Sequence, residues 1–215
     1  MRAKERGAQE IDRRIKMLNA LNARVQSMVR VSASVKASIA ARVQTEVSNL
    51  TVLKTKITGD PDFDLLRVDI KSVTDSYRIF MLVIPQGRIT VAADKIRTVA
   101  DSMTSFSAKL AARVATAKTD GKDTASAEAS LSDMNAKIGD AKVQADAAVS
   151  LVVNLTPDNG DKTKMDANNQ ALRDARAKIK AAMEDLQAAR KDAGSIMLTL
   201  RGMNSNVRSD TMIGI

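Results

Sequence analysis

Residues 172–203 read LRDARAKIKAAMEDLQAARKDAGSIMLTLRGM, and the apolar residues in this stretch recur at alternating spacings of three and four. They are Leu172, Ala175, Ile179, Ala182, Leu186, Ala189, Ala193, Ile196, Leu200 and Met203. A repeat of about 3.5 residues keeps one stripe of a helix facing a partner helix in a left-handed supercoil. The stretch therefore predicts a long helix that packs lengthwise against other helices.

Apolar residues at helical spacing fill four segments of the chain. These segments lie at about residues 8–58, 61–119, 123–155 and 162–204. Turn and capping residues separate them: Thr58-Gly59 with Asp60-Pro61, then Asp120-Gly121, then the turn at 156–161. Because the connections are short, consecutive helices are expected to lie antiparallel.

The second segment contains Pro85, followed by Gln86 and Gly87. Proline removes a backbone donor and clashes with the carbonyl four residues earlier. A kink or a break is therefore predicted at Pro85. The apolar runs Ile79–Ile84 and Leu151–Leu155 are expected to meet where the 156–161 turn packs beside Pro85, and to form the densest part of the core.

These patterns predict an all-α fold, an elongated antiparallel bundle of four long helices in which the second is kinked or broken at Pro85. Residues 1–204 are expected to form a single domain. From the segment lengths, a two-helix arm at about residues 35–84 either projects beyond the kink or folds back. The apolar pattern stops after Met203, so residues 205–215 are expected to form a frayed tail.

The composition argues against an enzyme. The chain of 215 residues has no Cys, no His and no Trp, and its aromatic residues are three Phe and one Tyr. Thiolate nucleophiles, imidazole bases and the usual transition-metal ligands are therefore missing. We expect no catalytic residue, no metal site and no cofactor. No apolar run approaches the about 20 residues of a transmembrane helix, and the charged N-terminus does not resemble a signal peptide.

Three groups of acidic residues resemble binding or catalytic sites, and each is better explained by a structural role. Asp60, Asp62 and Asp64 have the spacing of a calcium loop, but Leu65 and Lys71 stand where glycine and glutamate are needed. The acids of the turn at 158–161, with Asp166 beyond it, suit turn chemistry. The pairs Glu184-Asp185 and Asp133 with Asp140 lie among lysines and arginines, which suits ion pairs between helices.

The positive charge is concentrated in the first segment. Residues 1–59 carry 12 Lys and Arg against four Asp and Glu, in a chain whose net charge is +9. The candidate anion-binding patch consists of Arg6, Arg13, Arg14, Lys16, Arg24 and Arg30, with Arg2 and Lys4 before them. Such a patch attracts a surface polyanion or anionic lipid. Specific nucleic-acid binding is not expected, because aromatic stacking platforms and a recognisable reading helix are missing. A solvated face with a chance excess of charge is the alternative interpretation.

Two stretches carry a resemblance to a known group of proteins. The first is Tyr77-Arg78-Ile79-Phe80-Met81-Leu82-Val83-Ile84-Pro85-Gln86-Gly87-Arg88-Ile89, and the second runs from Leu155 to Asp161 and on through Arg176. With the Ala-rich heptads they resemble uncharacterised helical proteins of ultra-small candidate-phylum bacteria. The resemblance implies an extracytoplasmic location and no known activity.

The sequence therefore favours a non-enzymatic structural or interaction protein, a cell-surface or extracytoplasmic helical scaffold or spacer. It would bind a protein partner or self-associate as a homodimer. The alternative is an amphipathic bundle that binds anionic membrane lipid or surface polyanions through its basic first helix.

Overall fold

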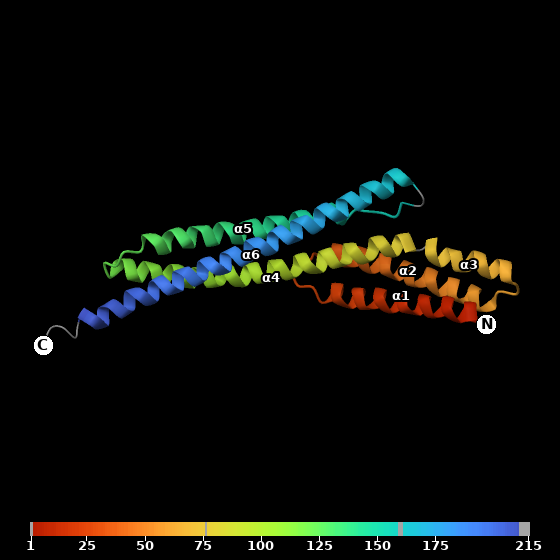
Figure 1. The fold of residues 1–215 in the computed structure, drawn as a ribbon, viewed down its shortest axis with the longest axis horizontal. Helices are drawn as coiled ribbons and strands as arrows, with labels where there is room; N and C mark the ends of the chain where they lie inside the picture. The colour runs from red at the N-terminus through yellow and green to blue at the C-terminus, as the bar shows by residue number, and fades with distance from the viewer. Residues whose placement is uncertain (1, 76, 159–160, 211–215) are drawn as a thin grey trace. The chain divides into compact units, whose positions relative to one another are not determined.

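The computed structural model describes residues 2–75, 77–158 and 161–210, and every regular element in these ranges is an α-helix. The helices are α1 (Arg2–Gln26), α2 (Ala33–Gly59), α3 (Phe63–Asp75), α4 (Tyr77–Thr119), α5 (Ala125–Val152) and α6 (Lys162–Asp210), as labelled in Figure 1. This confirms the all-α class. The sequence predicted one domain over 1–204, whereas the contacts define two compact units. Unit 1 comprises Met1–Asp94 and Ala148–Arg176, and unit 2 comprises Lys95–Ala147 and Ala177–Ile215.

The first predicted segment is not one helix, because it is interrupted between α1 and α2. Ser32 caps α2, and its hydroxyl accepts a hydrogen bond from the Val35 amide at 3.3 Å. The buried carboxylate of Asp94 accepts the amides of Val29 and Arg30 from the connection itself. The expectation of a continuous helix over 8–58 was therefore wrong. The amides that the break leaves without a helical acceptor donate instead to a side chain of α4, a helix distant in the sequence.

Helices α1, α2 and α3 pack side by side within unit 1 (Figure 1). Their shared core includes Ile11 and Leu18 of α1, Leu50 and Ile57 of α2, and Leu66 of α3. Helix α1 packs against both α2 and α3, whereas the sequence predicted a two-helix arm at about residues 35–84. Lys4 of α1 donates to the carbonyl of Asp60 at the end of α2, and Asp12, further along α1, pairs with Lys54, earlier in α2. The reversed order of these contacts shows that the two helices run antiparallel.

Helix α4 continues through Pro85, so the predicted break is absent, while a kink there stays a prediction. An interior proline costs a helix about 3 kcal/mol, and burial of the preceding residues Leu82, Val83 and Ile84 offsets that cost. The next residue, Gln86, is 5% exposed and donates to the carbonyls of Val152 and Leu155 at 2.6 and 3.0 Å. The expectation that the end of the third segment lies beside Pro85 is thereby confirmed. Ile79, Phe80 and Met81 fall outside the residues whose side chains the structure describes.

Gly87 permits a close approach between α4 and α1. A Cβ atom built on Gly87 would lie 2.5 Å from Cδ1 and 2.9 Å from Cγ of Leu21. No side chain fits there unless Leu21 moves. The Pro85-Gln86-Gly87 motif is therefore a helix-packing point inside α4, with α1 at Gly87 and the end of α5 at Gln86.

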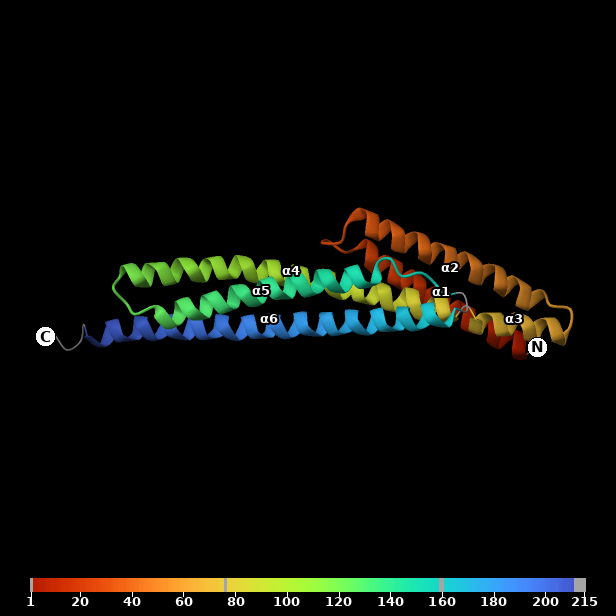
Figure 2. The same ribbon diagram turned by 90° about the horizontal axis from the view of Figure 1, so that it is seen from above.

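In unit 2, parts of α4, α5 and α6 run alongside one another (Figure 2). Their core combines Leu110 of α4 and Met134 of α5 with Ala189, Ala193 and Ile196 of α6. Ion pairs join neighbouring helices at the edge of this core, as between Lys142 and Asp101 at 2.8 Å. Ala189 and Ala193 of α6 are buried in this core.

The heptad stripe of α6 faces inward. Each of its ten residues from Leu172 to Met203 is buried or half-buried, which confirms the prediction from the spacing. In α4, Val99 and Phe106 are among the apolar residues whose helical spacing in the second segment predicts that they face the core, but Val99 is 47% exposed and Phe106 is 38% exposed. At the C-terminus, α6 extends to Asp210, so residues 205–210 are helical rather than frayed, and residues 211–215 lie outside the described chain.

Candidate functional site

Most of the predicted cations of α1 are exposed and share one side of the helix. Arg6, Arg13, Lys16 and Arg24 are all exposed. Arg6 and Arg13 are seven residues apart, and Arg13 and Arg24 are eleven apart. With 3.6 residues per turn, both spacings return to nearly the same direction. The sixth predicted residue, Arg30, is exposed in the connection that follows α1.

Arg14 does not belong to this exposed surface, which corrects the predicted patch. It is 6% exposed, and its Nη1 donates to the carbonyl oxygen of Val73 near the end of α3 at 2.5 Å. Its Nε donates to Oε1 of Glu10 at 2.9 Å. The guanidinium thus joins α1 to α3 through the Val73 carbonyl. Arg14 is a structural cation.

Glu10 is shared by two arginines. Arg13 donates to both carboxylate oxygens, at 2.8 and 2.7 Å, in addition to the bond from Arg14. The hydrogen bond from Arg13, with that from Arg14 and the two positive charges, lowers the pKa of Glu10 from 4.5 to about 2. The guanidinium of Arg13 is therefore engaged by Glu10, which makes it less available to another anion. The exposed cations with no ion pair among the described residues are Arg6, Lys16 and Arg24 on this helix, together with Arg2.

Lys4 has a structural role as well. Its Nζ donates to the carbonyl oxygen of Asp60 at 2.6 Å and lies 3.4 Å from that of Thr58. These carbonyls stand at the C-terminal end of α2, where a positive charge is favourable to the helix dipole. The first turn of α1 is thus fixed to the corner between α2 and α3.

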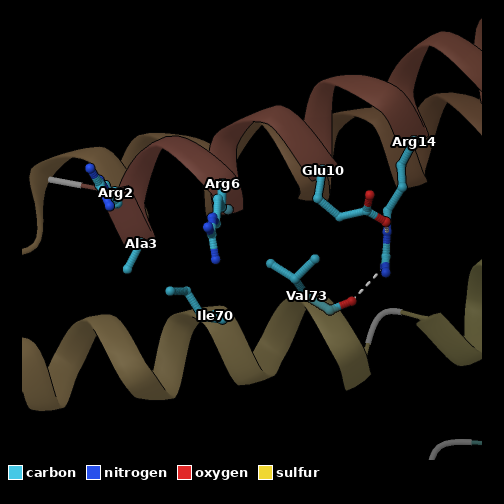
Figure 3. Close-up of a pocket in the computed structure, with 8 residues that line it drawn as sticks. Arg2, Ala3, Arg6, Glu10, Arg14, Ile70 and Val73 are labelled. Atoms are coloured by element: carbon cyan, nitrogen blue, oxygen red, sulfur yellow. Dashed lines mark hydrogen bonds and ion pairs between the residues drawn. The ribbon is translucent and has the colours of Figure 1, made fainter.

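A groove of about 670 Å³ lies between the N-terminal half of α1 and the C-terminal half of α3 (Figure 3). Arg2, Ala3, Arg6, Gly7, Glu10 and Arg14 line it from α1, and Ile70 and Val73 line it from α3. The Arg6 side chain points from α1 toward α3 (Figure 3). A volume of this size is typical of sites for small organic ligands.

The groove combines an apolar floor with a positive rim. Ala3, Gly7, Ile70 and Val73 offer carbon atoms and no side-chain polar group. Three arginines against one glutamate leave the lining with two excess positive charges. Because Glu10 is held by Arg13 and Arg14, its carboxylate is already neutralised.

The acidic candidates serve as caps and ion-pair partners. Asp62 accepts the Leu65 amide at 2.9 Å, as expected for the first turn of α3. Asp161 likewise accepts the Lys164 amide at 3.1 Å at the start of α6. In the described ranges, no group of three or more acidic residues could hold a metal ion. Asn159 and Gly160 lie outside them.

The carboxylates that the sequence places in adjacent pairs also serve as ion-pair partners of lysines. Glu184 pairs with Lys180 at 3.6 Å, and Asp185 pairs with Lys137 of α5 at 3.5 Å. Lys137 also approaches Asp140 at 4.0 Å. These contacts are surface pairs between or along helices, and they stabilise packing weakly.

Sequence reasoning located the basic helix but not the groove. The stripe containing Ile70 and Val73 was identified as apolar, but its partner helix was not known. A signal was available in Ala3 and Gly7, two small residues four apart on a basic helix, because small residues leave space beside a neighbouring helix.

Comparison with protein-family models, with curated proteins and with solved structures finds no match to this chain. In the described residues, no helix has both the length and the apolar content needed to cross a membrane.

Proposed function

We propose that this protein is a non-enzymatic helical scaffold or spacer that acts through the surfaces of its helices. The observation that supports it most directly is the inward-facing heptad stripe of α6. All ten apolar positions of this stripe, from Leu172 to Met203, are buried or half-buried. The polar residues beside such seams are engaged in pairs across helices, as in Lys142 with Asp101 and Lys137 with Asp185. Side chains arranged in this way hold helices together.

The proposal includes an elongated antiparallel bundle and an extracytoplasmic location, the latter resting on the sequence resemblance. Sedimentation velocity tests the shape, because a chain of 23.1 kDa in this form should show a frictional ratio well above that of a globular protein. A compact value would contradict the proposal. Fractionation of cells that produce the chain from its natural gene should find it outside the cytoplasm, and recovery in the cytoplasm alone would refute that location.

Self-association is proposed as one way in which the scaffold works. Val99 and Phe106 are exposed seven residues apart on α4, which places both on one face. Burying such residues against a second copy would remove apolar surface from water. Sedimentation equilibrium is expected to show a dimer that Phe106→Glu weakens. Val52→Glu, which changes a 58% exposed valine of α2, is the matched control. A monomer at high concentration would contradict this part.

A second candidate function is binding to anionic lipid or a surface polyanion through α1. The exposed positions of Arg6, Lys16 and Arg24 favour it. Binding of this kind weakens with salt, because exposed charges are screened. Flotation with vesicles of phosphatidylcholine and phosphatidylglycerol should therefore recover the chain at low salt and not at high salt. Its absence at low salt would exclude this candidate.

A further inference from the structure

We propose that the groove between α1 and α3 is a binding site for a single-chain anionic amphiphile, an alkyl carboxylate or alkyl phosphate. The inference goes beyond the scaffold role and does not depend on it. It rests on the groove and the charge of its lining.

The shape of the groove suits one alkyl chain. It extends along α1 from Arg2 to Arg14, twelve residues, which corresponds to about 18 Å at 1.5 Å per residue. Its floor consists of Ala3 and Gly7 on one side and Ile70 and Val73 on the other. A chain lying on this floor would cover the half-buried side chains of Ala3 and Ile70 and remove their remaining apolar surface from water.

The position of the groove's charge selects an anion. Arg2 and Arg6 are four residues apart, so both lie on the same side of the first two turns of α1, at one end of the groove. Both side chains are exposed, and neither is in an ion pair among the described residues. Guanidinium groups bind carboxylate and phosphate with two parallel hydrogen bonds. The partial positive charge at the N-terminus of α1 acts in the same direction.

At the other end of the groove the charged groups are already engaged. There Glu10 accepts hydrogen bonds from both Arg13 and Arg14, and Arg14, which is buried, also donates to the Val73 carbonyl. No exposed cation remains at that end of the lining. The geometry therefore orients a ligand with its head group at Arg2 and Arg6 and its chain toward Val73.

Calorimetric titration with dodecyl phosphate, below the concentration at which it forms micelles, tests the proposal. We expect saturable binding of one molecule per chain. Inorganic phosphate should bind at least about tenfold more weakly than dodecyl phosphate, because it lacks the alkyl chain. Neutral dodecyl maltoside should also bind at least about tenfold more weakly, because it lacks the negative charge. Equal binding of dodecyl maltoside, or no binding of dodecyl phosphate, would overturn the proposal.

Two variants localise the site. The double change Arg2→Gln with Arg6→Gln should weaken dodecyl phosphate binding at least about tenfold. The control, Lys109→Gln with Arg113→Gln, removes two exposed charges from α4, neither of which lines the groove, and should leave the affinity within about twofold. Equal losses in both would show a general charge effect and overturn the proposal.

Ala3→Glu provides a check that does not remove an arginine. Glutamate is a good helix former and is favourable in a first turn, so the fold should persist. Its carboxylate would compete with the ligand for Arg2 and Arg6. Unchanged affinity in this variant, with an unchanged circular dichroism spectrum, would also contradict the site.

Discussion

At the scale of single residues, the contact between Gly87 and Leu21 sets how closely two helices of unit 1 approach. The Leu21 side chain occupies the place where a Cβ of residue 87 would stand, 2.5 to 2.9 Å from it. Leu21 is itself 6% exposed, so little free volume surrounds it. Overfilling of such a well-packed position usually costs about 1–3 kcal/mol.

Gly87→Ala is therefore expected to lower the free energy of unfolding by about 1–3 kcal/mol, although alanine is the better helix former. Gly139→Ala in α5 is the matched control, because nothing lies within 4 Å of its added Cβ. There the gain in helix propensity acts alone, and the free energy of unfolding should rise by about 0.5–1 kcal/mol. Urea unfolding followed by circular dichroism measures both. An increase for Gly87→Ala would contradict the packing described.

Glu10 and Glu46 should respond to pH in opposite directions. The pKa of Glu10 is lowered to about 2 by its arginine partners. Its stabilising contribution is thus present above the unfolded value of 4.5 and is lost as the pH falls toward 2. Glu10→Gln should weaken the fold at pH 7 by about 1–3 kcal/mol, because buried Arg14 loses its carboxylate. The difference from the parent should shrink as the pH falls from about 4.5 to 2. A constant difference across that range would refute the role of the charge.

Glu46 is 8% exposed, and its burial raises its pKa. A pKa that folding raises gives stability at pH values below the unfolded value, and this stability is lost as the pH rises through the folded value. Ionised Glu46 therefore weakens the fold at neutral pH. Glu46→Gln should raise the free energy of unfolding at pH 7, with a gain that disappears below about pH 4. Glu184→Gln, which changes an exposed pair, should alter it by no more than about 0.5 kcal/mol at either pH.

At the scale of elements, the break between α1 and α2 depends on one acidic side chain of α4. Asp94 is 7% exposed and accepts the amides of two consecutive residues, Val29 and Arg30. Without it, these two amides would lose their charged acceptor in a partly buried place. The turn of the helical hairpin is therefore held from outside the hairpin.

Asp94→Ala is expected to lower the free energy of unfolding by about 1–3 kcal/mol, because two partly buried amides lose their hydrogen bonds to a charged acceptor. Asp94→Asn keeps one acceptor oxygen and should cost less. Amide hydrogen exchange supplies the specific readout, since Val29 and Arg30 should exchange faster in Asp94→Ala than in the parent. Unchanged exchange at both amides would contradict the role assigned to Asp94.

The same elements show what the sequence could predict and what it could not. The stripe from Leu172 to Met203 was predictable, because the spacing of neighbours along the chain sets which side of a helix is apolar. The break at residues 27–32 was not, because its acceptor is 64 residues from Arg30 in sequence. The burial of Arg14 depends on a carbonyl 59 residues away, so a basic patch read from one helix included a residue that α3 covers.

At the scale of the whole molecule, the composition sets the response to pH. The chain has no His and no Cys, so no side chain has an ordinary pKa between about 5 and 8. The stability differences at acidic pH come from carboxylates. Its net charge of +9 comes mostly from residues 1–59.

In the Glu46→Gln background, the free energy of unfolding should stay within about 0.5 kcal/mol between about pH 6 and 7, because carboxyl side chains ordinarily titrate at about pH 4, the α-amino group at about pH 8, and lysine, arginine and tyrosine at about pH 10 or above. Urea unfolding at fixed ionic strength measures it, and the parent chain serves as the control. A sigmoidal change within this range would contradict the expectation.

The contact at Gly87 has a consequence for how this sequence can diverge. A larger residue at position 87 becomes acceptable only when residue 21 shrinks, so the two positions should covary among descendants of this chain. The double change Leu21→Ala with Gly87→Ala imitates that exchange in the laboratory. The double change should lower the free energy of unfolding by less than the sum of the two single changes. This non-additivity would show that the two positions are coupled, as covariation requires.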